Sequence, residues 1–290
     1  MNREETAAAA AASLPPLREV IARHKLSARR ALGQHFLLDS NLTARIVRAA
    51  GDVRACNIYE VGPGPGGLTR ALLAAGAKRV VAVERDTRCR DALAELQVAY
   101  PGRLDVIQGD ALAIDEREVI DAPAAVVANL PYNISTALLL KWLQTPATFT
   151  AFTLMFQKEV AERLAAPPGT KTYGRLSVMT QWRGTVVKHF DIPPRAFVPP
   201  PKVVSTVIGL RPRSESPNDA GWPAMERVVA AAFGQRRKML RSSLRGLVAD
   251  PGRLLDDAGI AGTRRAEDLD IEAFRALART YERDQPQPAD

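Results

Sequence analysis

Cysteine is scarce in this sequence, and long apolar runs are absent from it. The two cysteines, Cys56 and Cys89, lie far apart with no cluster of histidine or cysteine beside them. This argues against a disulfide scaffold and a metal site, and reduced thiols are typical of the cytoplasm. No apolar run reaches the roughly 18 residues of a membrane helix, and the acidic, alanine-rich start is unlike a signal peptide. We expect a soluble, cytoplasmic protein without a metal or a membrane partner.

Acidic residues are fewer than basic residues. Lys and Arg total 40 against 32 Asp and Glu, which gives a net charge of +8 and a pI of about 9.8. A basic balance favours a polyanionic partner, although the total alone predicts only non-specific binding. The length of 290 residues and the 46% of apolar residues suit one large α/β domain with a smaller appendage.

Strand and helix patterns alternate through the middle of the chain. Apolar runs predict strands at 57–61, 79–83, 103–107, 124–128 and 152–156, and helices near 67–75, 87–98 and 135–143 lie between them. Such alternation is typical of βαβ units and a parallel sheet buried on both faces. Two further strands, 185–190 and 203–210, are joined by too short a spacer for a crossover helix. They predict an antiparallel pair that completes a seven-stranded sheet.

The flanking segments set the predicted domain boundaries. We expect a disordered lead-in over 1–12, a helix over 14–25, and a second helix that Asn41 caps. The polar stretch 211–223 predicts a linker, and everything from 224 to 283 has a helical pattern. The prediction is an extension and lead-in helix (1–30), an α/β domain (31–211) and a small helical domain (212–290).

A glycine-rich loop, EVGPGPGG (60–67), follows the first strand and opens a helix. Gly62, Gly64 and Gly67 fit the spacing G-x-G-x-x-G, and Glu84 ends the second strand, but dinucleotide-binding folds share this arrangement. A diphosphate cradle needs backbone N–H groups, which Pro63 and Pro65 lack. The loop therefore favours S-adenosylmethionine, whose ribose Glu84 would hold, and leaves a nucleotide cofactor as the alternative.

Asp110 follows the third strand, where ligands of such sheets bind. Its carboxylate could accept a hydrogen bond from the adenine of the cofactor. The alternative is an ordinary helix cap.

The most specific motif is Asn129-Leu130-Pro131-Tyr132, at the end of the fourth strand. Methylation of an adenine amine is difficult because the lone pair is delocalised into the ring. The Asn129 side-chain carbonyl and the Leu130 main-chain carbonyl could accept both N–H hydrogens and aim the lone pair at a methyl donor. Pro131 would make the turn rigid, and Tyr132 would stack on an extruded base. The alternative is a proline turn with a structural asparagine.

A run of positive charge lies near the C-terminus. No acidic residue occurs from Arg227 to Ala249, and the predicted helix places three arginines on one face. Such runs are usually solvated faces, but this one lacks balancing glutamates, which favours RNA phosphate contact. The residues are Arg236, Arg237, Lys238, Arg241 and Arg245. A second candidate is the N-terminal run Arg23, Lys25, Arg29 and Arg30.

Four further stretches carry a family resemblance: LGQHFLLD (32–39), QKEVAERLAAPPGTKTYGRLSV (157–178), FVPPPKVVS (197–205) and AFGQRRKMLRSSL (232–244). With the glycine loop and NLPYNIST, the chain resembles the ribosomal RNA adenine N6-dimethyltransferases of the KsgA (RsmA) type. The resemblance implies a Rossmann-like class I methyltransferase fold and S-adenosylmethionine as cofactor, with S-adenosylhomocysteine as product. It implies dimethylation of two adjacent adenines in the 3′-terminal hairpin of 16S rRNA, in the small ribosomal subunit or its precursor, by a monomer.

The resemblance also implies residue roles. Phe197 would pack on the target adenine opposite Tyr132, although by physics alone it could equally be ordinary packing. His35 alone would be a core or helix-edge histidine. The cofactor-binding residues that the resemblance implies are Gln34, His35, Leu37, Gly62, Gly64, Glu84, Arg85, Asp110, Ala111 and Asn129.

Three alternatives compete with this interpretation. One is an Erm-type methyltransferase that acts on large-subunit rRNA, against which QRRKMLRSSL and NLPYNIST argue. Another is a factor that binds RNA without catalysis, in ribosome assembly or as a mitochondrial-type transcription factor. The third, a nicotinamide dehydrogenase, rests on the glycine loop alone.

Overall fold

The protein forms two compact units. The computed structural model describes residues 14–29, 32–145, 148–213 and 219–285. The first unit, here the sheet unit, runs to Ala161 and includes Val187–Pro212, and the second, the helical unit, comprises Glu162–Val186 and the residues from Arg213 onward. Packing thus groups 162–186 with the C-terminal helices, whereas the sequence prediction placed this segment in the α/β domain.

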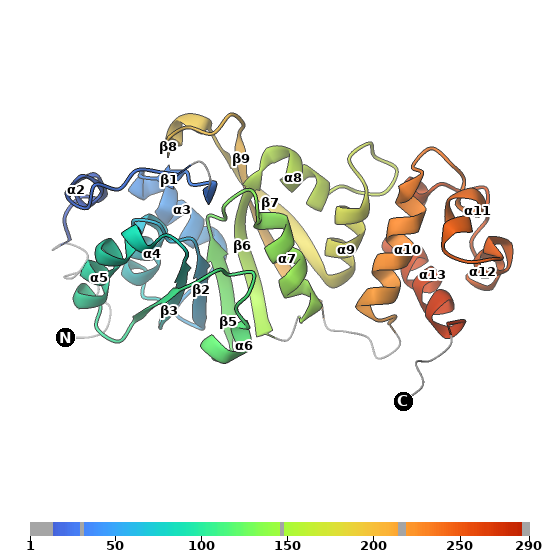
Figure 1. Cartoon of the computed structure of the whole chain (residues 1–290), viewed down its shortest axis with the longest axis horizontal. Coiled ribbons are helices and arrows are strands. Elements are labelled where there is room, and N and C mark those ends of the chain that lie inside the picture. The colour runs from blue at the N-terminus through green and yellow to red at the C-terminus, as the bar shows by residue number, and fades with distance from the viewer. Residues whose placement is uncertain (1–13, 30–31, 146–147, 214–218, 286–290) are drawn as a thin grey trace. The chain divides into compact units, whose positions relative to one another are not determined.

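The seven-stranded sheet that the sequence predicts is present (Figure 1). Its order is β4-β3-β2-β5-β6-β9-β7, where β2–β6 run parallel and β9 pairs antiparallel with β6. The last two predicted strands are neighbours at one edge, as expected. The strands are β2 (Asn57–Val61), β3 (Val80–Glu84), β4 (Leu104–Gln108), β5 (Ala124–Ala128), β6 (Phe149–Gln157), β7 (Gly184–Ile192) and β9 (Ser205–Pro212).

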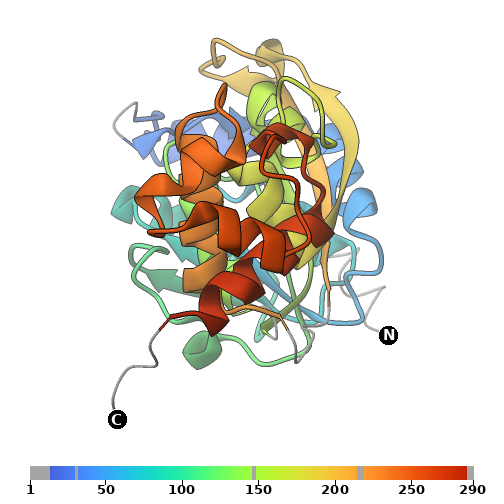
Figure 2. The same cartoon turned by 90° about the vertical axis from the view of Figure 1, so that its right-hand side faces the viewer.

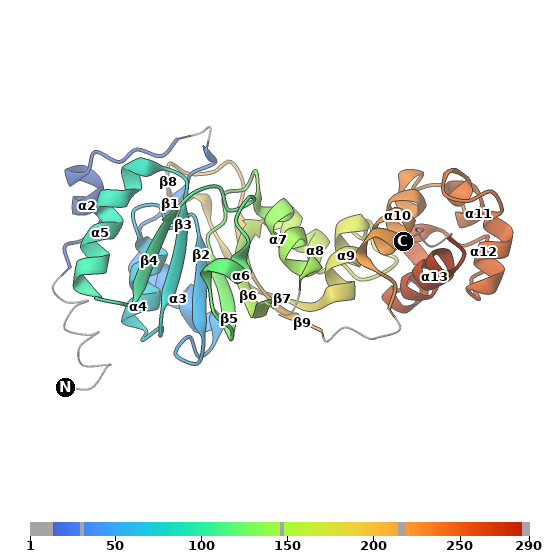
Figure 3. The same cartoon turned by 60° about the horizontal axis from the view of Figure 1, so that its bottom comes forward.

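Helices cover both faces of the sheet (Figure 3). Successive residues of a strand point to opposite faces. Ile58 packs in the main core with side chains of α3 (Ser40–Ala50), α4 (Gly67–Ala74) and α5 (Arg90–Ala99). Its neighbour Tyr59 contacts Trp142 of α7 (Ser135–Gln144) on the other face, with ring centroids 6.3 Å apart. This burial on both faces explains the continuous apolar runs of the central strands.

The N-terminal part differs from the prediction in two details. The helix α3 begins at Ser40, and its cap is Asp39, whose carboxylate accepts from the Asn41 N–H at 2.8 Å. A two-stranded sheet of β1 (Phe36–Leu37) and β8 (Phe197–Val198) was not expected. The preceding helix, α2, spans Leu17–Arg23. The predicted lead-in over 1–12 and Arg30 lie outside the described residues.

The helices of the helical unit can be followed in Figure 2. Its main helices are α9 (Arg175–Arg183), α10 (Trp222–Gly234), α12 (Pro251–Asp257) and α13 (Ile271–Arg283), and α8 (Lys158–Leu164) crosses the unit boundary. The predicted linker is shorter than expected, since β9 runs to Pro212 and α10 begins at Trp222. Among the described residues, no helix is both long and apolar enough to span a bilayer.

The basic run does not form one continuous helix, so this prediction was wrong. The helix α10 ends at Gly234, and a turn precedes the short α11 (Leu240–Ser243) and a 3-10 turn at Leu244–Gly246. The main-chain N–H of Leu240 donates to the carbonyl of Arg264 at 2.8 Å. This bond to a distant segment replaces the intrahelical bond that the sequence pattern predicts.

Candidate active site

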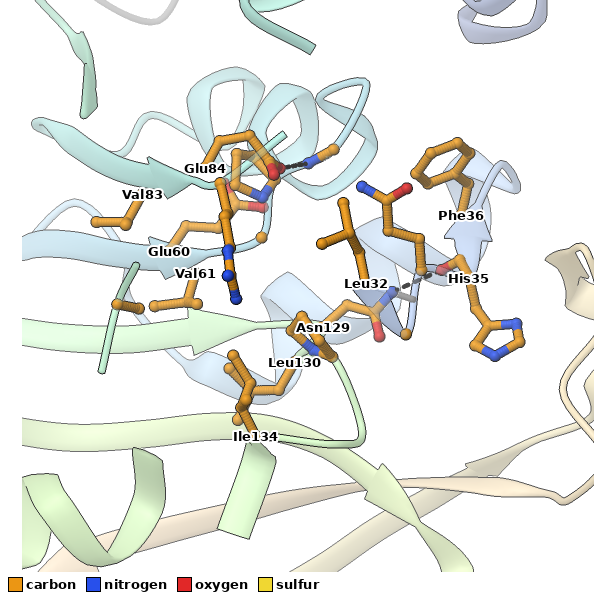
Figure 4. Close-up of a pocket in the computed structure, with 18 of the residues that line it drawn as sticks. Leu32, His35, Phe36, Glu60, Val61, Val83, Glu84, Asn129, Leu130 and Ile134 are labelled. Carbon is orange, nitrogen blue, oxygen red and sulfur yellow. Dashed lines mark hydrogen bonds between the residues drawn. The ribbon is translucent and has the colours of Figure 1, made fainter. Parts of the chain in front are cut away.

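A pocket of the sheet unit opens at the carboxyl ends of β2, β3 and β5 (Figure 4). Three segments form most of its lining: 32–37, 60–65 and 129–134. Glu84, Arg85, Asp110 and Ala111 complete it from the ends of β3 and β4. Every one of the predicted cofactor-binding residues therefore lines one pocket.

The glycine loop is shaped by contacts with the other two lining segments. Gly62 and Gly64 have φ angles of 71° and 56°, which other residues rarely adopt. A Cβ atom on Gly62 would lie 3.3 Å from Cδ of Pro131, and one on Gly64 would lie 3.2 Å from Cε1 of Phe36. The glycines thus allow the three segments to pack closely around the pocket.

Glu84 joins the glycine loop to the end of β3. Its carboxylate accepts a hydrogen bond from the Gly64 N–H at 2.9 Å (Figure 4) and another from the Asp86 N–H at 2.7 Å. Burial raises the pKa of Glu84, and these two bonds act in the opposite direction. A carboxylate has about four acceptor positions, so this side chain can accept further hydrogen bonds from a ligand.

Asp86 is a residue that the sequence analysis missed. Its buried carboxylate binds the guanidinium of Arg88 through both oxygens, at 2.9 and 2.5 Å, and accepts from Nε2 of Gln34 at 3.1 Å. The bonds from Arg88 are the main reason why the pKa of Asp86 is lowered. The predicted cofactor residue Gln34 is thereby fixed to the β3 end. The signal for Asp86 was only its position two residues after Glu84.

The amide of Asn129 has a defined orientation. Its Nδ2 donates to the main-chain carbonyl of His35 at 3.2 Å (Figure 4). Because a carbonyl can only accept, the NH₂ group must face His35, which turns Oδ1 away from that carbonyl. In the part of the chain that the structure describes, no hydrogen bond to this oxygen is found. Asn129, Leu130 and Pro131 all line the pocket.

Tyr132 and His35 lie together at the pocket, whereas Phe197 does not join them. The ring centroids of Tyr132 and His35 are 5.5 Å apart, and both residues line the pocket. Phe197 is only 2% exposed, belongs to the main core and pairs with Leu37 across β1 and β8. It is not a lining residue, so the structure does not place its ring opposite Tyr132.

Asp110 and Glu60 complete the acidic groups of the pocket. Asp110 accepts from the Leu112 N–H at 3.0 Å, which makes it a turn cap, and lies 3.4 Å from Nη1 of Arg85. Glu60, which the sequence analysis did not single out, is 1% exposed and accepts from Thr69 at 2.7 Å. Burial, with a smaller contribution from the charge of Glu84, raises the pKa of Glu60 to about 8.

The predicted RNA-binding residues of the helical unit fall into two groups. The guanidinium of Arg236 binds Glu267 at 2.9 Å and the carbonyl of Lys171 at 2.6 Å, so it holds two segments together. The other four are exposed: Arg237, Lys238, Arg241 and Arg245.

The sequence pattern of the family described as ribosomal RNA adenine dimethylase matches residues 25–283. The chain belongs to this family. It is 59% identical over 272 residues to ribosomal RNA small subunit methyltransferase A of Xanthobacter autotrophicus, which covers 92% of this chain and 94% of the relative. The protein of the same name from Rhodospirillum rubrum is 59% identical over 269 residues, 93% of each chain.

Solved structures of related enzymes share the fold. A dimethyladenosine transferase from Plasmodium falciparum is 25% identical with a TM-score of 0.70, and covers 84% of this chain and 96% of its own. The 23S rRNA methyltransferase ErmE is 27% identical with a TM-score of 0.63, and covers 84% and 98%. The fold is therefore that of a Rossmann-like methyltransferase, and the protein is an adenine dimethyltransferase.

Proposed function

We propose that the protein uses S-adenosylmethionine to dimethylate the N6 amines of two adjacent adenines in the 3′-terminal hairpin of 16S rRNA. The reaction belongs to small-subunit biogenesis in the cytoplasm. The observation that carries the proposal is the orientation of the Asn129 amide, whose Nδ2 faces the His35 carbonyl in a pocket lined also by the glycine loop and Glu84. The small-subunit choice is supported by 59% identity to small-subunit enzymes against 27% to ErmE.

The residues of the pocket fit this cofactor. When bound, S-adenosylmethionine supplies an electrophilic methyl group on a sulfonium. Glu84 keeps acceptor positions for ribose hydroxyls. Oδ2 of Asp110, which lies 3.4 Å from Nη1 of Arg85, can accept a hydrogen bond from the adenine amine of the cofactor. The glycine loop, which lines the pocket, would border the methionine end of the cofactor. Two of its residues, Pro63 and Pro65, have no N–H, so the loop lacks the donors of a diphosphate cradle.

Asn129 and Leu130 act on the substrate amine. In the first transfer, the amide oxygen of Asn129 and the carbonyl of Leu130 would accept the two N–H hydrogens of the adenine N6 atom, and in the second, one of them would accept the single N–H that remains. These hydrogen bonds withdraw the nitrogen from conjugation and direct its lone pair toward the methyl group. Each transfer forms the N6–CH₃ bond, breaks the bond between sulfur and methyl, and releases one proton from N6. The His35 carbonyl keeps the amide from flipping, because a flipped amide would place two oxygens against each other. No ionised nucleophile is needed.

Tyr132 supplies the stacking surface for the extruded adenine. Phe197, which the resemblance assigns to the opposite face of the base, would have to leave its buried position to do so. We therefore propose Tyr132 as the main aromatic contact. The four exposed basic residues of the helical unit, and Arg23, Lys25 and Arg29 of the sheet unit, are proposed to contact RNA phosphates.

A subunit-specific assay tests this function. Purified protein is incubated with labelled S-adenosylmethionine and with small or large ribosomal subunits from cells that lack the gene. We expect label in the small-subunit rRNA alone, recovered as N6,N6-dimethyladenosine. Label confined to the large subunit would instead support an Erm-type activity, and binding without any transfer would support an assembly factor.

A further inference from the structure

The hydroxyl of Tyr132 is held by a residue from a distant part of the chain. Ser205, the first residue of β9, is 0% exposed, and its Oγ lies 2.6 Å from the Tyr132 hydroxyl oxygen. Position 205 is tied into the sheet by its pairing with Gln157 of β6. A rigid strand thus fixes the far end of a ring whose near end is set by the turn at Pro131.

The ring of Tyr132 has a further neighbour. The imidazole of His35 lies 5.5 Å from it at an interplanar angle of 31°, and is itself held by a bond of 2.8 Å between Nδ1 and the Pro199 carbonyl. The torsion that turns a tyrosine ring has a broad energy minimum. Without the bond to Ser205, the ring could therefore rotate within the space between its neighbours.

The same bond limits what the phenol can do chemically. Burial raises the pKa of Tyr132, and the bond to Ser205 acts in the opposite direction. The hydroxyl is thus neutral and already engaged with Ser205, at the end of the ring away from the main chain. What Tyr132 can offer a base is the face of its ring, and the value of that face depends on its angle.

We propose that Ser205 is a positioning residue for methyl transfer: its hydroxyl sets the plane of the Tyr132 ring, and hence the plane of the stacked target adenine. A tilted base would move its amine away from the Asn129 oxygen, and misplacement of reacting atoms reduces the rate steeply. This inference rests on the proposed function, and it extends the catalytic arrangement to a strand that does not line the pocket.

The test compares Ser205→Ala, Tyr132→Phe and the double variant. Loss of one neutral hydrogen bond should lower kcat/KM for the RNA about fivefold in each single variant. The double variant should be no worse than either single one, because both remove the same bond. An RNA hairpin with 2-aminopurine at the target position reports stacking, and we expect weaker fluorescence quenching by Ser205→Ala than by the wild type. The Kd for S-adenosylmethionine should stay unchanged.

Thr206→Val is the matched control. Thr206 is buried on the same strand, faces the other side of the sheet, and donates to Asp191 at 2.6 Å. It should lower the melting temperature about as much as Ser205→Ala, without changing kcat/KM or the quenching. The role of Ser205 is overturned if the wild type is active and Ser205→Ala has the same kcat/KM. It is also overturned if Ser205→Ala and Thr206→Val lose equal amounts of kcat/KM. A wild type that transfers no methyl group overturns the proposed function instead.

Discussion

Gly62 and Pro131 lie so close that a Cβ atom on Gly62 would be 3.3 Å from Cδ of Pro131. Gly62 also has a φ angle of 71°. We expect Gly62→Ala to displace the turn that carries Asn129, and to reduce kcat for methyl transfer at least tenfold. Steady-state kinetics with small subunits measure this effect.

Gly102→Ala is the control for that variant. Gly102 has a φ angle of 70°, but a Cβ atom there would meet nothing within 4 Å. It should show the backbone strain, a loss of about 1 kcal/mol in unfolding free energy, without the loss of kcat. Equal kcat values for the two variants would show that the contact with Pro131 has no role in transfer.

Glu60 should make the stability of the ligand-free protein depend on pH. Its pKa is about 8 in the fold, against about 4.3 in an unfolded chain. The stability that this group contributes is present below the unfolded pKa and is lost as the pH rises toward 8, because the folded state holds the extra proton. Relative to Glu60→Gln, the wild type should lose roughly 1 kcal/mol per pH unit between about pH 5 and 8. Urea unfolding of both proteins at several pH values tests this. The prediction is contradicted if the unfolding free energies of the wild type and Glu60→Gln change with pH in parallel.

Lys141 should determine the affinity for the cofactor. Its Nζ donates to the carbonyl of Ala111 at 3.0 Å and to Glu116 at 2.8 Å, and so fixes the loop that follows Asp110. We expect Lys141→Met to weaken the binding of S-adenosylmethionine about tenfold, since hydrogen bonds to charged groups contribute more than neutral ones. Calorimetric titration measures the Kd. An unchanged Kd, with only a lower melting temperature, would limit Lys141 to a structural role.

Arg236 and Arg237 are adjacent, but we expect the first to stabilise the fold and the second to bind RNA. Arg236 binds Glu267 and two main-chain carbonyls, whereas Arg237 is exposed. Arg237→Gln should weaken RNA binding and reduce the slope of log K against log salt by roughly 0.7 to 0.9, with no change in melting temperature. Arg236→Gln should lower the melting temperature. The reverse pattern would mean that Arg237 does not contact RNA.

The central strands could be predicted because burial on both faces requires continuous apolar runs, as at Asn57–Val61 and Ala124–Ala128. The residues at their carboxyl ends followed from the topology, since the carboxyl ends of parallel strands meet at one edge. Glu84, Asp110 and Asn129, which end or follow three of these strands, all line one pocket for this reason.

Other features depend on contacts between distant segments. The basic run has helical periodicity, but the bond from Leu240 to Arg264 gives its backbone a different partner. The roles of Asp86 and Ser205 arise from Arg88, Gln34 and Tyr132, and a local pattern contains no record of such partners. Phe197 was assigned by resemblance, and its burial comes from the unexpected pairing of β1 with β8.

The most direct test of the account concerns Asn129. Cells that lack the gene are supplied with the wild type or with Asn129→Ala, and N6,N6-dimethyladenosine in small-subunit rRNA is measured by mass spectrometry. The wild type should restore both modified adenines, and Asn129→Ala should restore neither, although the purified variant still binds the subunit. Dimethylation restored by Asn129→Ala would contradict the proposal that this amide holds the adenine amine.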